Sequence, residues 1–492
     1  MSDAAELEHL LAGLANSDAV DVYDGGRLQP HLAKFQYELR QQQEKLLLHL
    51  WTEEGNLVRR VLRLAEISSD YVALEVARFG QAKPGRLEFI RRLQARDGAR
   101  ITREKFRRHF QPLLEQQFPD EKVESLTTAR DLEHSFSGSY VRGVMRRGKR
   151  AWAVMGVASA EAAAAQDSIL SFGLLWLDWM RRHTPGLSLA GLRLFVPRGG
   201  ATTTAHRMRA LAPSSRVELF EVDESQWRVH AVDVEDAGNI DTWLTPRRDV
   251  DRALAAGGES IQKIRNLAPE AIDMVVPPGT KAVALRFRGL GFARWQAGAL
   301  EFGLEERRQT LTKANWKGLE RLVGRLARHR NPDARDVNHA LYRAQPERWL
   351  ESLLVRDPTR VDAHLNPACV YSQVPAFSAG DRGVLDLLGV RRDGRLVVIE
   401  VKASEDIHLV LQAADYWLRV RAHHERGEFA QYGYFHGVEL QDRPPVLCLI
   451  APGFRFHPST EVILRYLSPE IEVQRIGLNE GWRQGIQVVF RD

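Results

Sequence analysis

The chain alternates between two patterns of apolar residues. Short runs that are apolar at every second position or throughout are typical of strands, and examples begin at Arg193 (RLFVPRG) and Val446 (VLCLIAPG). Longer stretches with apolar residues three and four positions apart predict amphipathic helices between these runs. Because strand and helix patterns follow one another along most of the chain, the sequence predicts an α/β fold of mixed sheets flanked by helices.

The same succession of patterns occurs twice. The strand-like run that ends at Pro197 resembles the run that ends at Pro452, and RAWAVMGVAS (150–159) resembles RLVVIEVKAS (395–404). Short α/β stretches can look alike by chance, but matches that recur in one order favour a tandem duplication. We therefore expect two copies of one plan, in which a small β-hairpin module precedes an α/β domain.

Changes in composition suggest where these parts meet. The stretch from Val232 to Ser260 is acidic and then rich in Ala and Gly, which is typical of a joint between copies. The periodic stretch HLAKFQYELRQQQEKLLLHLW (31–51) predicts a helix before the first copy. The expected parts are a helical arm (1–60), a β-rich module (61–115), an α/β domain (116–235), a linker (236–262), a second β-rich module (263–335) and a second α/β domain (336–492).

Bulk composition narrows the class of protein. A chain of 492 residues with 44% hydrophobic and 27% charged residues is expected to form several globular domains. It has no apolar run long enough for a membrane helix and no basic-then-apolar signal at its start, so we expect a cytoplasmic protein without membrane contact. Two cysteines are too few for a disulfide framework or a Cys-rich zinc site. The net charge of +5 is compatible with a nucleic-acid partner.

Residues 383–402 combine a predicted hairpin with charged side chains. Two strand-like runs, GVLDLL and RLVVIEVKA, flank an Asp-Gly dipeptide that is typical of a hairpin turn. Side chains alternate along a strand, so Glu400 and Lys402 share one face, and pairing of the strands brings Asp386 close to Glu400. Lys402 is also the only lysine after Lys317, in a chain where most basic residues are arginine.

Two carboxylates and one ammonium on an apolar sheet indicate metal chemistry. Clustered carboxylates repel each other unless a cation lies between them. Carboxylate oxygens prefer hard cations, so the predicted cofactor is Mg²⁺ or Mn²⁺, with water and a substrate phosphate completing the coordination. Lys402 suits the positioning of the attacking water because lysine is a compact cation that can lose its proton, whereas arginine cannot.

Two predicted helices complete the pattern. PERWLESLL places Glu347 and Glu351 on one face, and the helix over 407–423 places Gln412 and Tyr416 on one face. In order, E-x-x-x-E-x-L-L, D-P, G-V-L-D-L-L-G, D-G-R-L-V-V-I-E-V-K and Q-x-x-x-Y resemble the catalytic domain of RecB-like nucleases in the PD-(D/E)xK, or restriction-endonuclease-like, superfamily. The resemblance is to mismatch and flap endonucleases and to related defence nucleases. It covers about a sixth of the chain, and everything before Pro332 departs from those enzymes.

The resemblance assigns roles to individual residues. It implies that the second α/β domain is a restriction-endonuclease-like domain whose reaction is metal-dependent phosphodiester hydrolysis. It implies catalytic roles for Asp386, Glu400, Lys402, Glu351, Gln412 and Tyr416. It implies a metal site formed by Asp386, Glu400 and Val401.

The first copy lacks this chemistry. Aligning 154–158 with 398–402 places Gly156 at the position of the glutamate and Ala158 at that of the lysine. The aspartate position falls near Arg142, the Gln and Tyr positions fall near Ser171 and Leu175, and Glu133 is retained on the expected first helix. We infer a degenerate copy that keeps the fold and cannot hold a metal ion.

A basic stretch lies in that degenerate copy. Its members are Arg142, Arg146, Arg147, Lys149 and Arg150. One interpretation is that these residues contact phosphates of bound nucleic acid, and the other is that they form a solvated turn.

The favoured function is a metal-dependent DNA endonuclease with one active and one degenerate half, in repair or in defence. Such a chain would act as a monomeric pseudo-dimer or as a homodimer, and it would cut one strand at a time. The alternative is an inactive nuclease-like module kept for binding nucleic acid or a protein partner. A third possibility is a nuclease activated by RNA or a nucleotide, with the first half as the sensor.

Overall fold

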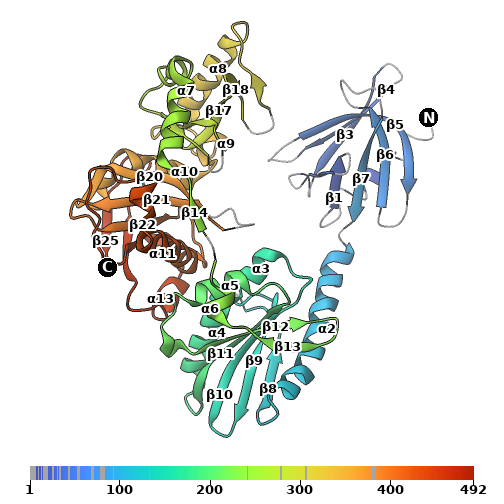
Figure 1. The fold of residues 1–492 in the computed structure, drawn as a ribbon. Helices are drawn as coiled ribbons and strands as arrows, with labels where there is room; N and C mark the ends of the chain where they lie inside the picture. Colours follow the sequence, from blue (N-terminus) through green and yellow to red (C-terminus); the bar gives the residue numbers. More distant parts are fainter. Residues whose placement is uncertain are drawn as a thin grey trace. The chain divides into compact units, whose positions relative to one another are not determined.

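The structure is a computed structural model that describes most of the chain. The described residues are 7–8, 10–12, 14, 20–24, 27–29, 32, 35–42, 45–51, 56–67, 71–77, 84–91, 93–131, 133–240, 242–277, 280–304, 307–378 and 384–492. It forms two units, residues 1–109 and residues 110–492, which are described separately below. Helices and strands are mixed throughout, so the chain belongs to the α/β class (Figure 1).

The first unit contains a seven-stranded antiparallel sheet in the order β2-β1-β7-β6-β5-β4-β3. Its strands are β1 (Val20–Asp24), β2 (Arg27–Leu28), β3 (Gln36–Gln42), β4 (Lys45–Trp51), β5 (Asn56–Ile67), β6 (Tyr71–Ala77) and β7 (Gly85–Arg91). Alternate apolar residues of these strands form one core, in which Leu48, Leu74 and Phe89 are fully buried.

The helix predicted over 31–51 is wrong. The stretch forms strands β3 and β4, with Leu39 paired to Leu48. Its Leu, Glu, Gln and Lys residues favour helices, but Leu46, Leu48 and Leu50 also alternate with period two, and burial of that face in the sheet outweighs the local preference. Since β1–β4 and β5–β7 share one sheet, the structure has no boundary near residue 60.

Helix α2 (Leu93–Gln117) leads into the second unit, whose first sheet has six strands in the order β13-β12-β11-β10-β9-β8. These strands are β8 (Lys122–Thr127), β9 (Tyr140–Arg147), β10 (Arg150–Val157), β11 (Ser188–Pro197), β12 (Val217–Asp223) and β13 (Arg228–Ala231). Helices of this half are α3 (Ala163–Asp167), α4 (Ile169–His183), α5 (Thr202–Met208) and α6 (Val234–Ala237). We call residues 110–240 the first half.

The second large sheet has seven strands in the order β14-β20-β21-β22-β23-β24-β25. They are β14 (Thr242–Leu244), β20 (Leu365–Ser378), β21 (Val384–Arg391), β22 (Leu396–Val401), β23 (Val446–Pro452), β24 (Glu472–Leu478) and β25 (Val488–Arg491). Its helices are α10 (Pro346–Arg356), α11 (Leu409–Glu425), α12 (Glu428–Gln431) and α13 (Ser459–Leu464). We call residues 336–492 the second half; Gly383, which opens its predicted hairpin, lies outside the described residues.

The two sheets share one topology. With β14 set aside, the first three strands of each sheet are antiparallel neighbours, the next two join in parallel through helical crossovers, and the last is antiparallel again. Strands β8–β13 therefore correspond one by one to β20–β25, and α4 and α5 correspond to α11 and α13. This is the arrangement expected from a tandem duplication.

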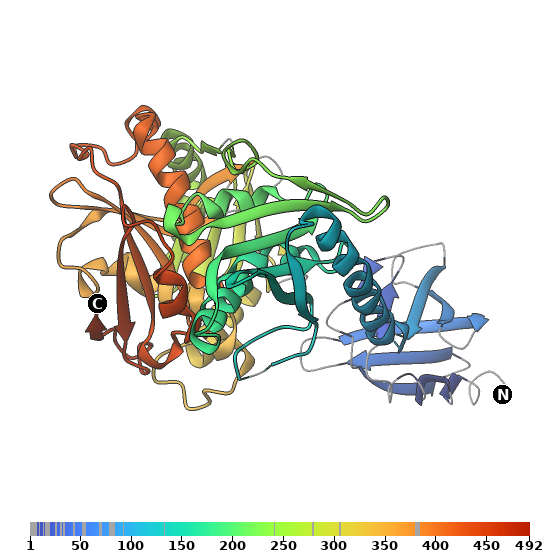
Figure 2. The ribbon, with the colours of Figure 1, turned by 90° about the horizontal axis from the view of Figure 1, so that it is seen from below.

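The halves pack against each other as a pseudo-symmetric pair. Helix α4 lies against α13, and its counterpart α11 lies against α5, as Figure 2 shows for α11 in orange beside the green helices. A short antiparallel bridge joins the halves: Ala212 N–H donates to the Tyr466 carbonyl at 2.9 Å, and Ser468 N–H donates to the Ala210 carbonyl at 2.8 Å. One hydrophobic core runs through both halves.

A smaller β module precedes α10. It contains α7 (Arg247–Arg265), strands β15 (Ile272–Val275), β16 (Val283–Phe287), β17 (Leu290–Gln296), β18 (Ala299–Phe302) and β19 (Gln309–Thr310), and helices α8 (Trp316–His329) and α9 (Ala340–Arg343). The linker predicted over 236–262 is ordered instead: Trp243 of β14 pairs with Phe377 of β20, and α7 packs in the core of the module. The Ala- and Gly-rich composition is typical of a linker. The pairing of β14 with the distant strand β20 leaves no periodic pattern in the local sequence.

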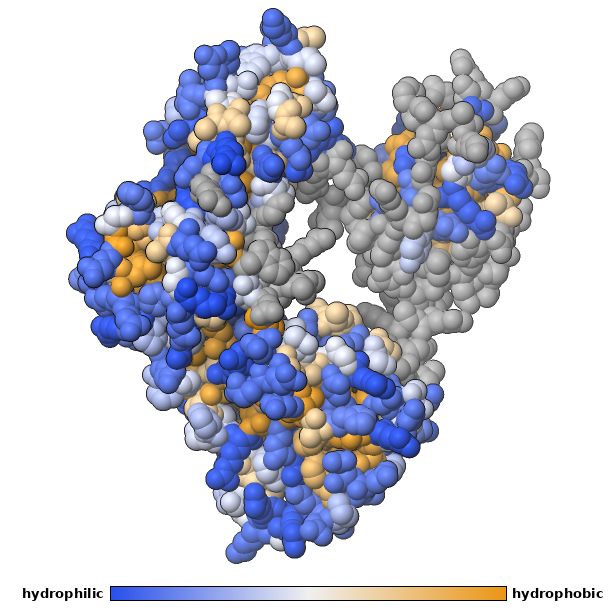
Figure 3. Space-filling view, viewed as in Figure 1, coloured by the Kyte–Doolittle hydropathy of each residue, from blue (hydrophilic) through white to orange (hydrophobic). Residues whose placement is uncertain are grey.

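Hydrophobic residues gather in four clusters, one for the shared core of the halves, one beneath α10, one for the module and one for the first unit. Hydrophilic residues cover most of the face drawn in Figure 3, with hydrophobic residues in small patches. Among the helices that the structure describes, none combines the length and the apolar character needed to cross a membrane.

Candidate active site

The predicted hairpin is present and brings two carboxylates together. Leu387 of β21 pairs with Ile399 of β22, so the next positions, Asp386 and Glu400, lie opposite each other. The backbone N–H of Val401 donates to Oδ2 of Asp386 at 3.0 Å. Glu400 is 1% exposed and faces the side of the sheet that α11 covers.

Lys402 lies at the end of β22 beside these carboxylates. Its Nζ is 3.5 Å from Oε1 of Glu400 and 3.2 Å from Oδ2 of Asp406. It also donates to Oε1 of Gln412 at 3.1 Å, and Nε2 of Gln412 donates to the Tyr416 hydroxyl at 3.3 Å. The Gln–Tyr pair on α11 thus fixes the position of the ammonium group.

Helix α10 supplies a third carboxylate and a cation. Glu351 is 3% exposed, and its Oε2 accepts from Nη1 of Arg348 at 2.6 Å. The same Nη1 lies 3.5 Å from Oδ1 of Asp386. The Arg348 guanidinium therefore stands between two carboxylates and neutralises part of their repulsion.

Burial changes the proton affinities of these groups. It raises the pKa of Glu351 to about 7, against the opposing charge of Arg348. It raises the pKa of Glu400 well above the ordinary value, and the charge of Asp386 adds to this effect. Burial also raises the pKa of Asp386, although the Val401 N–H opposes the shift. For Lys402, burial lowers the pKa, but the carboxylates of Glu400 and Asp406 outweigh it and raise the pKa overall.

These shifts predict a pH-dependent stability effect at Glu351. A carboxyl whose pKa is raised on folding destabilises the folded state above its unfolded pKa, and the penalty is complete above the folded pKa of about 7. Glu351→Gln removes that charge, so we expect the metal-free variant to gain up to about 3 kcal/mol over wild type at pH 8 and little at pH 5. Urea unfolding at both pH values measures this, and a gain that is equal at both would contradict it.

The carboxylate oxygens of this cluster are the donor type that hard divalent cations prefer. Oε2 of Glu400 is buried without a hydrogen-bond partner among the described residues, which is costly for a carboxylate unless a cation or proton satisfies it. Within the described part of the chain, no three His, Cys, Asp or Glu side chains are already close enough to hold a metal. Arg348 separates Glu351 from Asp386, so metal binding would require this guanidinium to move.

In the first half, the alignment placing Gly156 and Ala158 at the Glu400 and Lys402 positions is wrong by one residue. The residues of β10 that face α4 are Ala151, Ala153, Met155 and Val157. Gly156 faces α2 instead, where a Cβ atom would lie 2.9 Å from the Phe110 ring. A shift of one residue moves every side chain to the opposite face of a strand. Met155 and Val157 therefore take the positions of the glutamate and the lysine.

The remaining equivalences in the first half also change. Arg142 pairs with Met155, so it takes the position of Asp386. Glu133 lies in a turn and is exposed, not on a helix. Ser171 Oγ shares a hydrogen bond of 3.1 Å with Nδ1 of His408 in the second half, and Leu175 is buried in the shared core. At these positions the first half therefore has no counterpart of the Asp386, Glu400 and Lys402 cluster.

The basic stretch does not form one surface. Arg142 is 5% exposed, whereas the four other residues lie at the exposed β9–β10 hairpin. Arg146 is paired with Glu124 at 3.2 Å and Arg147 with Asp120 at 3.1 Å. Because these pairs neutralise two of the hairpin charges, the interpretation as a solvated turn describes the hairpin better.

The structure brings all six predicted catalytic residues into one site and adds two groups that sequence reasoning missed. Arg348 and Asp406 contact the cluster directly. The spacing of Arg348 three residues before Glu351 gave a local signal for that ion pair. Asp406 precedes α11 in a loop, where no periodicity marks the direction of a side chain.

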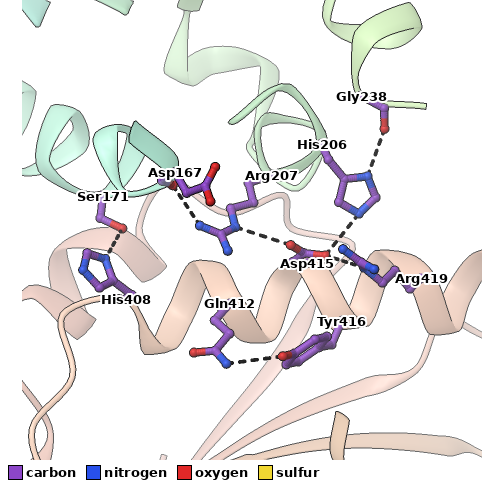
Figure 4. Close-up of polar contacts among 10 residues, drawn as sticks. All are labelled: Asp167, Ser171, His206, Arg207, Gly238, His408, Gln412, Asp415, Tyr416 and Arg419. Carbon is purple, nitrogen blue, oxygen red and sulfur yellow. Dashed lines mark hydrogen bonds and ion pairs between the residues drawn. The ribbon is translucent and has the colours of Figure 1, made fainter. Parts of the chain in front are cut away.

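Helix α11 also anchors the site to the first half. Asp415 of α11 is buried, and its carboxylate lies 2.6 Å from Nε of Arg419, 3.4 Å from Nε2 of His206 and 3.4 Å from Nε of Arg207. Figure 4 shows Gln412 and Tyr416 on one side of α11 and this buried network on the other. The first half therefore holds α11, whose Gln412 accepts a hydrogen bond from Lys402.

Comparison with protein-family models gives no match, and comparison with curated proteins gives no significant match.

Proposed function

We propose that the chain is a metal-dependent nuclease that hydrolyses phosphodiester bonds, with DNA favoured over RNA. The observation that carries the proposal is the buried Glu400 carboxylate, whose unpartnered Oε2 lies beside Asp386 and Lys402 on paired strands. A structural ion pair has no need for an unsatisfied buried oxygen, whereas a metal ligand does.

Each residue of the cluster has its own role in the proposed reaction. Asp386 and Glu400 would hold Mg²⁺ or Mn²⁺, together with the carbonyl of Val401, because the Val401 side chain is buried on the other face. The bound cation would supply Lewis-acid activation of the phosphodiester. Lys402, held by Gln412 and Tyr416, orients the attacking water and offsets negative charge in the transition state. Glu351 adds a third carboxylate once Arg348 has moved.

A cleavage assay tests the proposal. Wild type and Glu400→Gln would be incubated with Mg²⁺ or Mn²⁺ and with supercoiled, linear, single-stranded, flap and mismatched DNA and RNA, with EDTA as the metal-free control. The exposed Glu439→Gln is the matched variant from the same half. We expect cleavage that EDTA and Glu400→Gln abolish and Glu439→Gln leaves intact. Binding without cleavage of every substrate would favour the inactive binding module or an activated nuclease.

Because only one half has the carboxylates and the lysine, we expect nicking. Supercoiled plasmid should convert first to the open-circular form, and linear product should appear only after a second, independent cut. Gel analysis of a time course at low protein concentration measures the order of products. Direct conversion to linear plasmid would show that two active sites act together, as in a homodimer.

The Arg348 guanidinium should compete with the metal for the carboxylates. We expect Arg348→Gln to bind Mn²⁺ about three- to tenfold more tightly in the absence of nucleic acid, since a cation next to Asp386 and Glu351 is removed. Electron paramagnetic resonance of free Mn²⁺ during titration measures the affinity. Arg356→Gln on the same helix, where the arginine pairs with Asp273 at 3.1 Å, is the control. Unchanged or weaker Mn²⁺ binding by Arg348→Gln would contradict this competition.

A further inference from the structure

The first half contains a buried cation that forms no ion pair with a carboxylate among the described residues. Arg142 of β9 is 5% exposed, and its Nε and Nη1 atoms have no hydrogen-bond partner among the described residues. The guanidinium lies 4.8 Å from the centre of the Phe136 ring and 5.6 Å from that of Trp176. The nearby carboxylate of Asp131 is already paired with His134 at 2.8 Å. Such a buried group is costly unless an anion satisfies it.

This guanidinium occupies the place of a catalytic carboxylate. Arg142 pairs with Met155 on β10, as Asp386 lies opposite Glu400 on β22. Like Glu400, which is 1% exposed, Arg142 lies below the surface. In the second half, a bound divalent cation would make the site attractive to a phosphate. In the first half, Arg142 offers a positive charge at the equivalent position without any metal, and Met155 and Val157 offer no group for hydrolysis.

Aromatic rings extend from the guanidinium toward the surface. Trp176 stacks on Trp179 with centroids 5.1 Å apart and planes at 11°, and Trp179 stacks on the exposed His183 at 4.4 Å and 15°. The indole Nε1 of Trp179 is buried without a partner among the described residues. Trp179 is stacked on both sides and Phe136 and Trp176 are buried, so the rings hold the guanidinium, and a phosphate is the group that its free N–H donors suit.

We propose that this Arg142 cluster, defined as Arg142, Phe136, Trp176 and Trp179, binds the sugar-phosphate backbone of the strand that the active half does not cut. The proposal rests on the proposed nuclease function. The halves pair through equivalent helices, and the proposal assigns one strand of a duplex to the site that cleaves and the other strand to the site that only holds. The ligand class is a backbone phosphodiester, recognised without regard to sequence.

Binding in EDTA tests the proposal independently of cleavage. Fluorescence anisotropy with labelled duplex and single-stranded oligonucleotides would compare wild type, Arg142→Met and the control Arg146→Met. We expect Arg142→Met to weaken binding about tenfold and to lower the slope of log K against log salt by about 0.9 for duplex, because one phosphate contact is lost. Arg146→Met, whose arginine is exposed and paired with Glu124, should change the affinity less than about twofold.

The slope of log K against log salt distinguishes phosphate binding by Arg142 from a purely structural role. In a structural role, the substitution would lower the melting temperature and leave the salt dependence of binding unchanged. If Arg142→Met does not fold, cross-linking of wild type to bromodeoxyuridine oligonucleotides decides the question. Cross-links to Trp176, Trp179 or Phe136 support the proposal, and cross-links confined to other residues overturn it. An unchanged affinity and slope in folded Arg142→Met also overturn it, even where wild type cleaves DNA. Absence of cleavage by wild type would instead overturn the nuclease function.

Discussion

Lys402→Ala should reduce cleavage by about a thousandfold. The ammonium group is the only cation within reach of both Glu400 and Gln412, at 3.5 and 3.1 Å, among the described residues. In the proposed mechanism, its removal takes away the group that orients water and offsets transition-state charge, while the carboxylates assigned to the metal remain. Single-turnover cleavage with saturating Mg²⁺ measures the loss.

Two further variants sharpen this prediction. Lys402→Arg should not restore activity, because a planar guanidinium is larger and does not fit the place of the compact ammonium between Glu400, Asp406 and Gln412. Lys317→Ala, at an exposed lysine of α8, should cleave like wild type. Binding of oligonucleotides in EDTA should change little in Lys402→Ala, since the residue acts on the reaction rather than on the backbone. A variant that retains more than about a tenth of wild-type activity would exclude the assigned role.

The sequence was most informative where local rules decide the structure. The hairpin of β21 and β22 follows from an Asp-Gly turn in which Gly394 adopts φ +89°, and its Cβ would lie 2.1 Å from the Glu439 carbonyl. Alternation along β22 then places Glu400 and Lys402 on one face, and four-residue spacing places Gln412 and Tyr416 on one face of α11. Both of these placements depend only on the residue spacing that brings side chains to one face, which is two residues in a strand and three or four in a helix.

Other features depend on packing between distant segments. The apolar run of β10 contains no polar residue that distinguishes its two faces, so the sequence aligned it with β22 one position out of register. The contact of β10 with α4 shows the correct register. Arg348 reaches Asp386 only because α10 packs on β20–β22, a contact that the sequence of either element does not encode alone. Strands β3 and β4 were predicted as a helix because their residues suit both periods.

The second large effect should come from Asp415, which we expect to be essential for stability although it touches no active-site group. Asp415→Ala would leave Arg419, Arg207 and His206 without their shared carboxylate in the buried interface between the halves. Removing one partner from a buried ionic network costs about 3–5 kcal/mol, because the remaining charge stays desolvated. Urea or thermal unfolding of the full chain measures the loss, with the exposed Asp442→Ala as control.

The pH dependence gives an independent check of the same network. Burial by itself raises the pKa of Asp415, but contact with His206 and the charges of Arg419 and Arg207 outweigh it and hold the pKa well below the ordinary value. A carboxyl with a depressed folded pKa stabilises the protein above its unfolded pKa of 3.8, and the contribution is lost as pH falls below that value. The stability difference between wild type and Asp415→Ala should therefore be constant from pH 6 to 8 and shrink toward pH 3.

Because α11 also carries Gln412 and Tyr416, the folded fraction of Asp415→Ala should cleave more slowly than wild type. Cleavage by that fraction at the wild-type rate would show that the first half does not position the candidate active site.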